Sequence, residues 1–205
     1  DLESGFQALR GIRRHRPAIE AAYRMIRLAL IAHHNDPDAR AELDLWAGAF
    51  CPITGPVWAL TGTFGLESAK GKVACRPLVV GALKGLQGTV VPGTNRDEVS
   101  SLLKEANAGS SGPLVLHGDG PSGIAPTSLP PGFVTEWDTP LRVWADLLRS
   151  GIPLAEVRLL CVNGDPFAAF ECRLAAALGA RVAVIPDSGG CAADMDSAAA
   201  RRFFP

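Results

Sequence analysis

Three short loops, each directly after an apolar run, carry glycine together with hydroxyl or amide side chains. They are Thr61-Gly62-Thr63, Gly93-Thr94-Asn95 and Asn163-Gly164. A glycine lets a ligand approach the backbone, and free N–H groups ahead of a helix can hold phosphate oxygens. One such loop is an ordinary turn, but three in one predicted sheet favour a site for a nucleotide-like small molecule.

Two acidic residues follow the third loop. Asp165 precedes Pro166, which is typical of a helix N-cap; the alternative is a ligand contact to a ribose hydroxyl, because an aspartate repels phosphate. Glu171 either stabilises the positive end of the helix dipole or acts in general acid–base catalysis with a second group. Arg173 points to another face of the predicted helix. His117, after a predicted strand, is either a hydrogen-bonded loop residue or a minor site candidate.

The run Asn95-Arg96-Asp97-Glu98 indicates a capping box at the start of another helix, with Glu98 at the third helical position. Positive charge to balance a phosphate must then come from nearby basic side chains, each of which is equally explained as a solvated residue. These are Lys70, Lys72, Arg76 and Arg96.

A parallel sheet is the element that brings such loops together. Residues 157–190 form an apolar run, a turn, an amphipathic segment and a second apolar run, which predicts a strand–helix–strand unit. Ligands of such sheets bind beyond the carboxyl ends of the strands. Further strands are predicted at 56–60, 89–91 and 113–117, helices at 77–86, 96–107 and 140–149, and an irregular segment at 118–139. The expected fold is therefore α/β, a Rossmann-like doubly wound parallel sheet.

The first 51 residues instead show helical periodicity and form a predicted N-terminal extension, with residues 52–205 as the ligand-binding domain. One helix begins near Pro17, and Asn35-Asp36-Pro37 separates it from a second. The expected apolar faces comprise Ile19, Tyr23, Ile26 and Leu30 in the first helix, and Leu43, Trp46, Ala47 and Phe50 in the second. Arginines make this region locally basic, but interspersed acids favour a solvated face or a partner surface over nucleic-acid binding.

Composition restricts the class of protein. The 205 residues are 47% hydrophobic and carry a formal net charge of −1, so neither nucleic acid nor a membrane surface is an expected partner. The five cysteines are odd in number and show no CxxC spacing, and no signal-peptide pattern opens the chain. Both observations indicate a reducing, cytoplasmic location. No metal and no cofactor are expected. Because the sequence begins at Asp1 and not at a methionine, we expect a fragment of a longer chain or a processed product. The expected partner of this segment is the rest of such a chain or a second copy in a homo-oligomer.

From about residue 57 to residue 190 the chain resembles the SLOG superfamily, in its prokaryotic, TRPM-associated (LSDAT-type) branch. The resemblance rests on TGT at 61–63, PGT at 92–94 and the LLRSG…VNGD…FE…LGA segments between 147 and 180. It implies a Rossmann-like fold that binds nucleotides or NAD-derived molecules, often as a sensor module. The related LOG (Lonely Guy) enzymes hydrolyse an N-glycosidic bond in a nucleotide.

Carried over by residue, the resemblance places Thr61, Gly62 and Thr63 in a first ligand loop, and Gly93 and Thr94 in a second. Asn163 and Gly164 match the start of the LOG motif PGGxGTxxE, and Glu171 matches its last position. The chain departs from the family at Asp97, Asp165, Phe167 and Ala168, where relatives carry glycine or threonine. Phe167 would fill space that the LOG pattern leaves to its ligand, unless its ring turns into the core.

The expected function is a sensor domain that recognises a nucleotide or NAD-derived ligand, such as ADP-ribose or cyclic ADP-ribose, and signals to an attached domain or partner. Two alternatives remain: a LOG-like phosphoribohydrolase that uses Glu171, and a degenerate SLOG fold that acts as an assembly module. The expected ligand-binding residues are Thr61, Gly62, Thr63, Gly93, Thr94, Asn95, Arg96, Asn163, Gly164, Asp165, Glu171, Ser188 and Gly189.

Overall fold

The centre of the molecule is a five-stranded parallel sheet with the order β3-β2-β1-β4-β5. The computed structural model describes residues 16–47, 50, 52–64, 75–93, 96–108, 114–116, 138–185 and 188–195. Its strands are β1 (Val57–Gly62), β2 (Gly88–Pro92), β3 (Leu114–Leu116), β4 (Arg158–Val162) and β5 (Arg181–Val184). The predicted doubly wound α/β fold is confirmed. From β1 the chain first adds β2 and β3 on one side, and then returns to add β4 and β5 on the other side. The strand order therefore reverses between the neighbours β1 and β4, and sheets of this kind bind ligands at that switch point.

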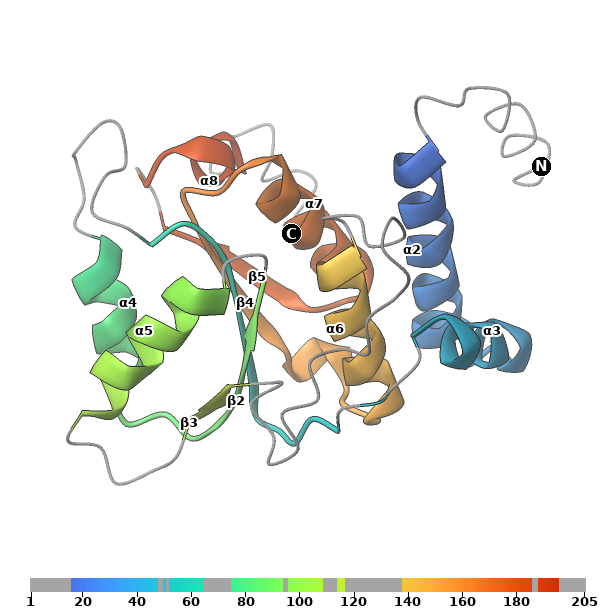
Figure 1. The fold of residues 1–205 in the computed structure, drawn as a ribbon, viewed down its shortest axis with the longest axis horizontal. Helices are drawn as coiled ribbons and strands as arrows, with labels where there is room; N and C mark the ends of the chain where they lie inside the picture. Colours follow the sequence, from blue (N-terminus) through green and yellow to red (C-terminus); the bar gives the residue numbers. More distant parts are fainter. Residues whose placement is uncertain are drawn as a thin grey trace.

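Helices cover the two faces of the sheet as two layers (Figure 1). On one face lie α4 (Cys75–Leu83) and α5 (Arg96–Asn107), which share a buried cluster with Leu60, Val90 and Val162. On the other lie α6 (Asp138–Arg149) and α7 (Pro166–Ala177), packed on Ala59 and Leu159. A 3-10 turn, η2 (Leu154–Glu156), leads into β4, and α8 (Gly190–Met195) follows β5. Within the described ranges no helix is long and apolar enough to cross a membrane.

Several predicted boundaries move for local reasons. The helix expected at 77–86 runs from Cys75 to Leu83, and Gly85 after it has a φ of 76°. The strand expected at 56–60 extends to Gly62, so Thr61 and Gly62 belong to β1 and not to the loop after it. The helix predicted at 96–107 is confirmed. Of the segment 118–139, only Asp138 and Thr139 are described, and they open α6.

The N-terminal helices α2 (Arg16–His34) and α3 (Pro37–Ala47) are separated at the predicted break, where Asn35 has a φ of 48°. They contribute to the same buried cluster as α6 and α7, through Ala21, Leu28, Ile31, Ala39, Leu43 and Ala47. The predicted face of α2 is thus confirmed only at Leu30, which packs partly buried against this cluster, whereas half-buried Tyr23 and Ile26 are not among its residues. The side chain of Ile19 lies outside the described part of the structure. In α3 Leu43 and Ala47 are buried as expected, whereas Phe50, beyond its end, is exposed.

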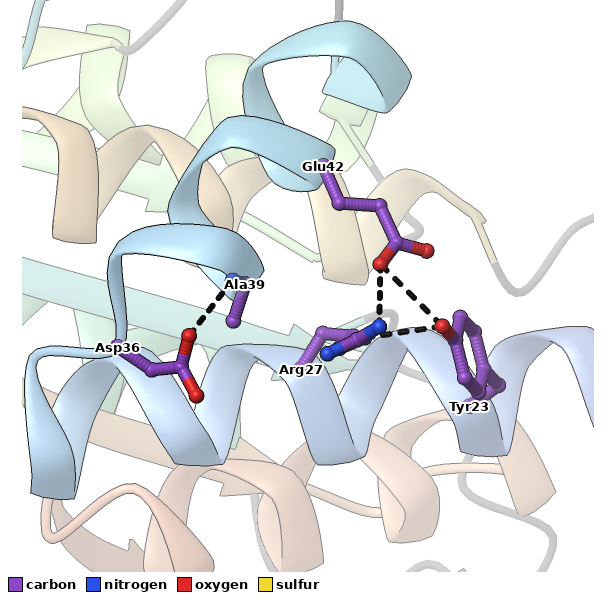
Figure 2. A network of polar contacts seen from close by, with 5 residues as sticks. All are labelled: Tyr23, Arg27, Asp36, Ala39 and Glu42. Atoms are coloured by element: carbon purple, nitrogen blue, oxygen red, sulfur yellow. Dashed lines mark hydrogen bonds and ion pairs between the residues drawn. The ribbon is translucent and has the colours of Figure 1, made fainter. Parts of the chain in front are cut away.

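A polar cluster on the surface joins α2 to α3 (Figure 2). Glu42 pairs with Arg27 at 2.6 Å and accepts a hydrogen bond from the Tyr23 hydroxyl at 3.2 Å. The Arg27 Nε–H donates to the same hydroxyl oxygen at 2.9 Å. At the start of α3 the Asp36 carboxylate accepts from the Ala39 N–H at 2.9 Å, as an N-cap does. Every charged group of this cluster has a partner and remains partly in contact with water.

Candidate functional site

The loops after β1, β4 and β5 meet at the carboxyl edge of the sheet, at the switch point. The Thr63 N–H donates to the Val162 carbonyl at 3.0 Å, and Asn163 Nδ2 donates to Thr63 Oγ1 at 2.8 Å. The Asn163 N–H donates to Ser188 Oγ at 2.8 Å. Thr63 is exposed and Asn163 half-buried, so this edge presents hydroxyl and amide groups to solvent on a braced backbone.

Gly62 allows β1 and β4 to approach each other at this edge. Its φ is 99°, and a Cβ there would overlap the backbone of Val162 and lie 3.2 Å from the Gly164 nitrogen. A side chain at this position would therefore be excluded by both the backbone conformation and the neighbouring strand.

A fully buried carboxyl group lies beneath this edge. Glu171, in the second turn of α7, has an exposed fraction of 0%. Its Oε1 accepts a hydrogen bond from Trp144 Nε1 on α6 at 3.4 Å, and its Oε2 has no hydrogen-bond partner within the described structure. A Cβ on Gly93, at the end of β2, would lie 2.6 Å from Oε2 and 2.8 Å from Thr61 Oγ1. Gly93 thus provides the space in which the carboxyl group and the Thr61 hydroxyl face each other.

Burial raises the pKa of Glu171 to about 7, against the lowering effects of the Thr61 hydroxyl and the Trp144 indole. The Thr61 hydroxyl is near enough to favour the ionised form, although neither Thr61 Oγ1 nor Oε2 has a partner with hydrogen-bond geometry. A buried, incompletely bonded carboxyl costs folding free energy. A stabilising role at the helix dipole does not explain this cost, and the raised pKa places the titration of Glu171 near neutral pH.

Asp165 is the N-cap of α7, as predicted. One carboxylate oxygen accepts from the backbone N–H groups of Phe167 and Ala168, both at 3.0 Å. The amides that would otherwise hold a phosphate at this helix are thus bonded to a carboxylate. Asp165 itself is exposed, and Phe167 is half-buried.

Asn95, the first residue of the predicted capping box, lies outside the described residues, so the box stays a prediction. Glu98 is the third residue of α5, but its carboxylate accepts from the Phe64 N–H at 2.8 Å and so ties down the loop after β1. Arg76, expected as a phosphate partner, instead pairs with Glu105 at 2.9 Å and donates to Ser101. Lys70 and Lys72 lie outside the described residues, as does the side chain of Arg96.

The predicted site residues fall into three groups. Those with solvent contact at the edge are Thr63, Asn163, Gly164, Asp165 and Gly189. Those brought to the same edge but buried are Thr61, Gly62, Gly93, Glu171 and Ser188. Those outside the described residues are Thr94, Asn95 and the minor candidate His117. Arg173 is exposed and points away from buried Glu171, as expected.

Two contacts of the site could not be predicted from the sequence. Trp144, on α6, donates a hydrogen bond to Glu171, and the sequence does not mark it as a residue of the site. Glu98 was assigned to its own helix, although it bonds a loop thirty-four residues earlier. Both contacts join separate elements, and no local pattern in the sequence marks them.

The described residues contain no group of three His, Cys, Asp or Glu side chains that could hold a metal ion. They do contain a sheet edge that Gly62 and Gly93 line and that hydrogen bonds between its loops hold in place, with the carboxyl group of Glu171 buried beneath it. Comparison of the chain with protein-family models, with curated proteins and with solved structures gave no match.

Proposed function

We propose that this chain binds a nucleotide or NAD-derived small molecule, of the ADP-ribose type, and passes its occupancy to an attached domain or partner. The observation that carries the proposal is the meeting of the loops after β1, β4 and β5 at the switch point, joined by the Asn163–Thr63 hydrogen bond. Open parallel sheets bind their ligands at this position.

The local chemistry favours one orientation of such a ligand. Asp165 bonds the first amides of α7 and adds negative charge there, which disfavours a phosphate above that helix. A ribose hydroxyl can donate to an exposed carboxylate, so we place the sugar beside Asp165. The exposed Thr63 hydroxyl can then donate to a polar group of the ligand while it accepts from Asn163.

Thermal-shift measurements with ADP-ribose, cyclic ADP-ribose, NAD and AMP test this proposal. A ligand at about a hundred times its dissociation constant should add roughly 2.7 kcal/mol to the free energy of unfolding. The shift should shrink in Thr63→Val and persist in Thr54→Val, a matched control whose exposed threonine precedes β1 at the other end of the strand. The proposal fails if no ligand shifts the melting temperature, or if both variants respond like the original; the first result favours an assembly module.

A LOG-like hydrolase is the second candidate, and Glu171 is the observation that favours it. A carboxyl group with a pKa of about 7 and an unpartnered oxygen is suited to general acid–base catalysis. Its complete burial beneath Gly93 weighs against direct contact with a substrate.

Release of free base from AMP, NAD or cyclic ADP-ribose distinguishes the two candidates. A hydrolase should lose a factor of about 10² or more in turnover in Glu171→Gln, and none in Glu156→Gln, whose exposed glutamate lies in η2. A pure binding domain should release no base, and Glu171→Gln should alter its ligand affinity only modestly. Sustained turnover that depends on Glu171 would replace the first proposal by the second.

A further inference from the structure

Two thiols lie side by side at the carboxyl edge of the sheet. The Sγ atoms of Cys161, on β4, and Cys191, on α8, are 3.7 Å apart, although the residues are thirty positions apart in the chain. Neither cysteine is in a disulfide. A disulfide needs an S–S separation of about 2.05 Å and Cα atoms about 4.4–6.8 Å apart. At 3.7 Å the two sulfurs are in contact, and they must move closer for a bond to form.

The backbone around the two sulfurs holds them near each other. The Cys191 N–H donates to the Gly164 carbonyl at 3.0 Å, and the Ala192 N–H donates to the Asn163 carbonyl at 2.9 Å. Gly164 leaves the space that the sulfurs occupy: a Cβ on this residue would lie 2.5 Å from Cys191 Sγ and 3.2 Å from Cys161 Sγ. The start of α8 is thus fastened to the loop that follows β4.

The two cysteines differ in access to solvent. Cys161 is fully buried, whereas Cys191 is half-buried. A hydrogen bond with Cys172 raises the pKa of the Cys161 thiol, and a hydrogen bond with Cys191 lowers it. Burial raises it further, so the pKa lies above its ordinary value. An oxidant therefore meets Cys191 first, and Cys161 is positioned to react with the product.

We propose that Cys161 and Cys191 form a redox-active pair that a hydroperoxide converts to a disulfide between β4 and α8. The Cys191 thiolate attacks one peroxide oxygen; the O–O bond breaks, Cys191 becomes a sulfenic acid, and the other oxygen leaves as water or an alcohol. The Cys161 sulfur then displaces hydroxide from the Cys191 sulfur, and its proton leaves with that hydroxide as water. The two sulfurs together lose two electrons, and the peroxide gains them.

The bond would join the end of β4 directly to α8, beside Asn163 and Gly164. These residues belong to the candidate ligand edge, but the pair stands on its own geometry and does not depend on the proposed ligand. Reduction by a dithiol would restore both cysteines.

The test treats the full chain with hydrogen peroxide, blocks remaining thiols by alkylation and maps the peptides without reduction. Trypsin leaves Cys161 and Cys172 together in residues 159–173, so a second cut, by mild acid at the Asp165–Pro166 bond, is needed to separate them and leaves residues 182–201 whole. We expect a crosslink between the Cys161 fragment and residues 182–201, the loss of two hydrogen atoms from the intact mass, and reversal by dithiothreitol. The crosslink should be lost in Cys191→Ala and retained in Cys75→Ala, whose buried cysteine lies on α4.

A crosslink from Cys161 to Cys172 would overturn the proposal. So would Cys191 that oxidises beyond the sulfenic acid with no crosslink, or an unchanged intact mass after treatment. The wild-type peptide map decides between these outcomes without any variant, so a misfolded variant cannot obscure the result.

Discussion

Two polar clusters of this molecule use similar residue types in opposite surroundings. On the surface, Glu42 accepts from Tyr23 and pairs with Arg27, and all three groups are satisfied (Figure 2). Inside, Glu171 accepts a hydrogen bond from Trp144 at 3.4 Å and faces the Thr61 hydroxyl, but its Oε2 has no partner with hydrogen-bond geometry among the described residues. The first cluster fastens two helices together, whereas the second holds an acid under the edge where the strand order reverses.

The difference is informative because solvent changes the free energy of each arrangement. An exposed ion pair contributes little, since water and salt screen it. A buried carboxyl group without full hydrogen bonding costs free energy of folding, and groups of this kind are common at functional sites.

Gly93→Ala should be the most damaging of these changes. Gly93 has no left-handed backbone, so the cost comes from the added Cβ, which would press on Glu171 Oε2 and Thr61 Oγ1. We expect a loss of about 2–3 kcal/mol in the free energy of unfolding, measured by urea denaturation. The matched change Gly81→Ala, on the exposed side of α4, should be neutral or stabilise by up to about 1 kcal/mol. Equal effects would show that the contact over Glu171 is not tight.

Glu171→Gln should stabilise the protein at pH 8 and remove a pH dependence. The folded pKa, about 7, exceeds the ordinary value of 4.5, so the folded state retains a proton that the unfolded state has released. Wild-type stability should therefore be complete below about pH 4.5, fall as the pH rises towards 7 and level off above it. The shift corresponds to about 3 kcal/mol at most, and we expect about 1–3 kcal/mol from denaturation curves across this range. A wild-type curve that rises over this interval would contradict the buried, protonated acid.

Trp144→Phe should destabilise by an amount that grows with pH. The indole N–H favours the ionised form of Glu171, so its removal should raise the pKa of that carboxyl further. Below pH 4.5 only the lost packing remains, about 1–2 kcal/mol, and above pH 7 the lost hydrogen bond adds about 1 kcal/mol. In a Glu171→Gln background this additional dependence on pH should vanish. If it persists there, the indole acts through another group.

Glu42→Gln should have the smallest effect, about 0.5 kcal/mol, because the pair with Arg27 is solvent-exposed. Moderate salt should reduce the difference between variant and wild type further. Chemical denaturation by urea at two added salt concentrations measures it. A loss above about 2 kcal/mol would mean that the surface cluster, and not packing alone, holds α2 and α3 together.

Much of the fold could be predicted because the responsible interactions are local. The strand–helix–strand unit at 157–190, the bounds of α5 and the break at Asn35 all follow from residues near each other in the chain. Asp165 caps α7 as its position before Pro166 indicates. Gly151 has the positive φ, 69°, expected of a glycine that ends a helix.

The sequence by itself therefore determined the succession of strands and helices along the chain and the turns between them. It also determined which loops a parallel sheet brings to one edge. Tertiary packing decided which face of α2 is buried, because α2 carries apolar residues on two sides and α6 with α7 covers only one. It also decided that Glu171 is buried, that Glu98 reaches Phe64, and that Cys161 meets Cys191. Such contacts join residues distant in the chain, and their free energy depends on the space and solvent that neighbouring elements leave, which no local pattern encodes.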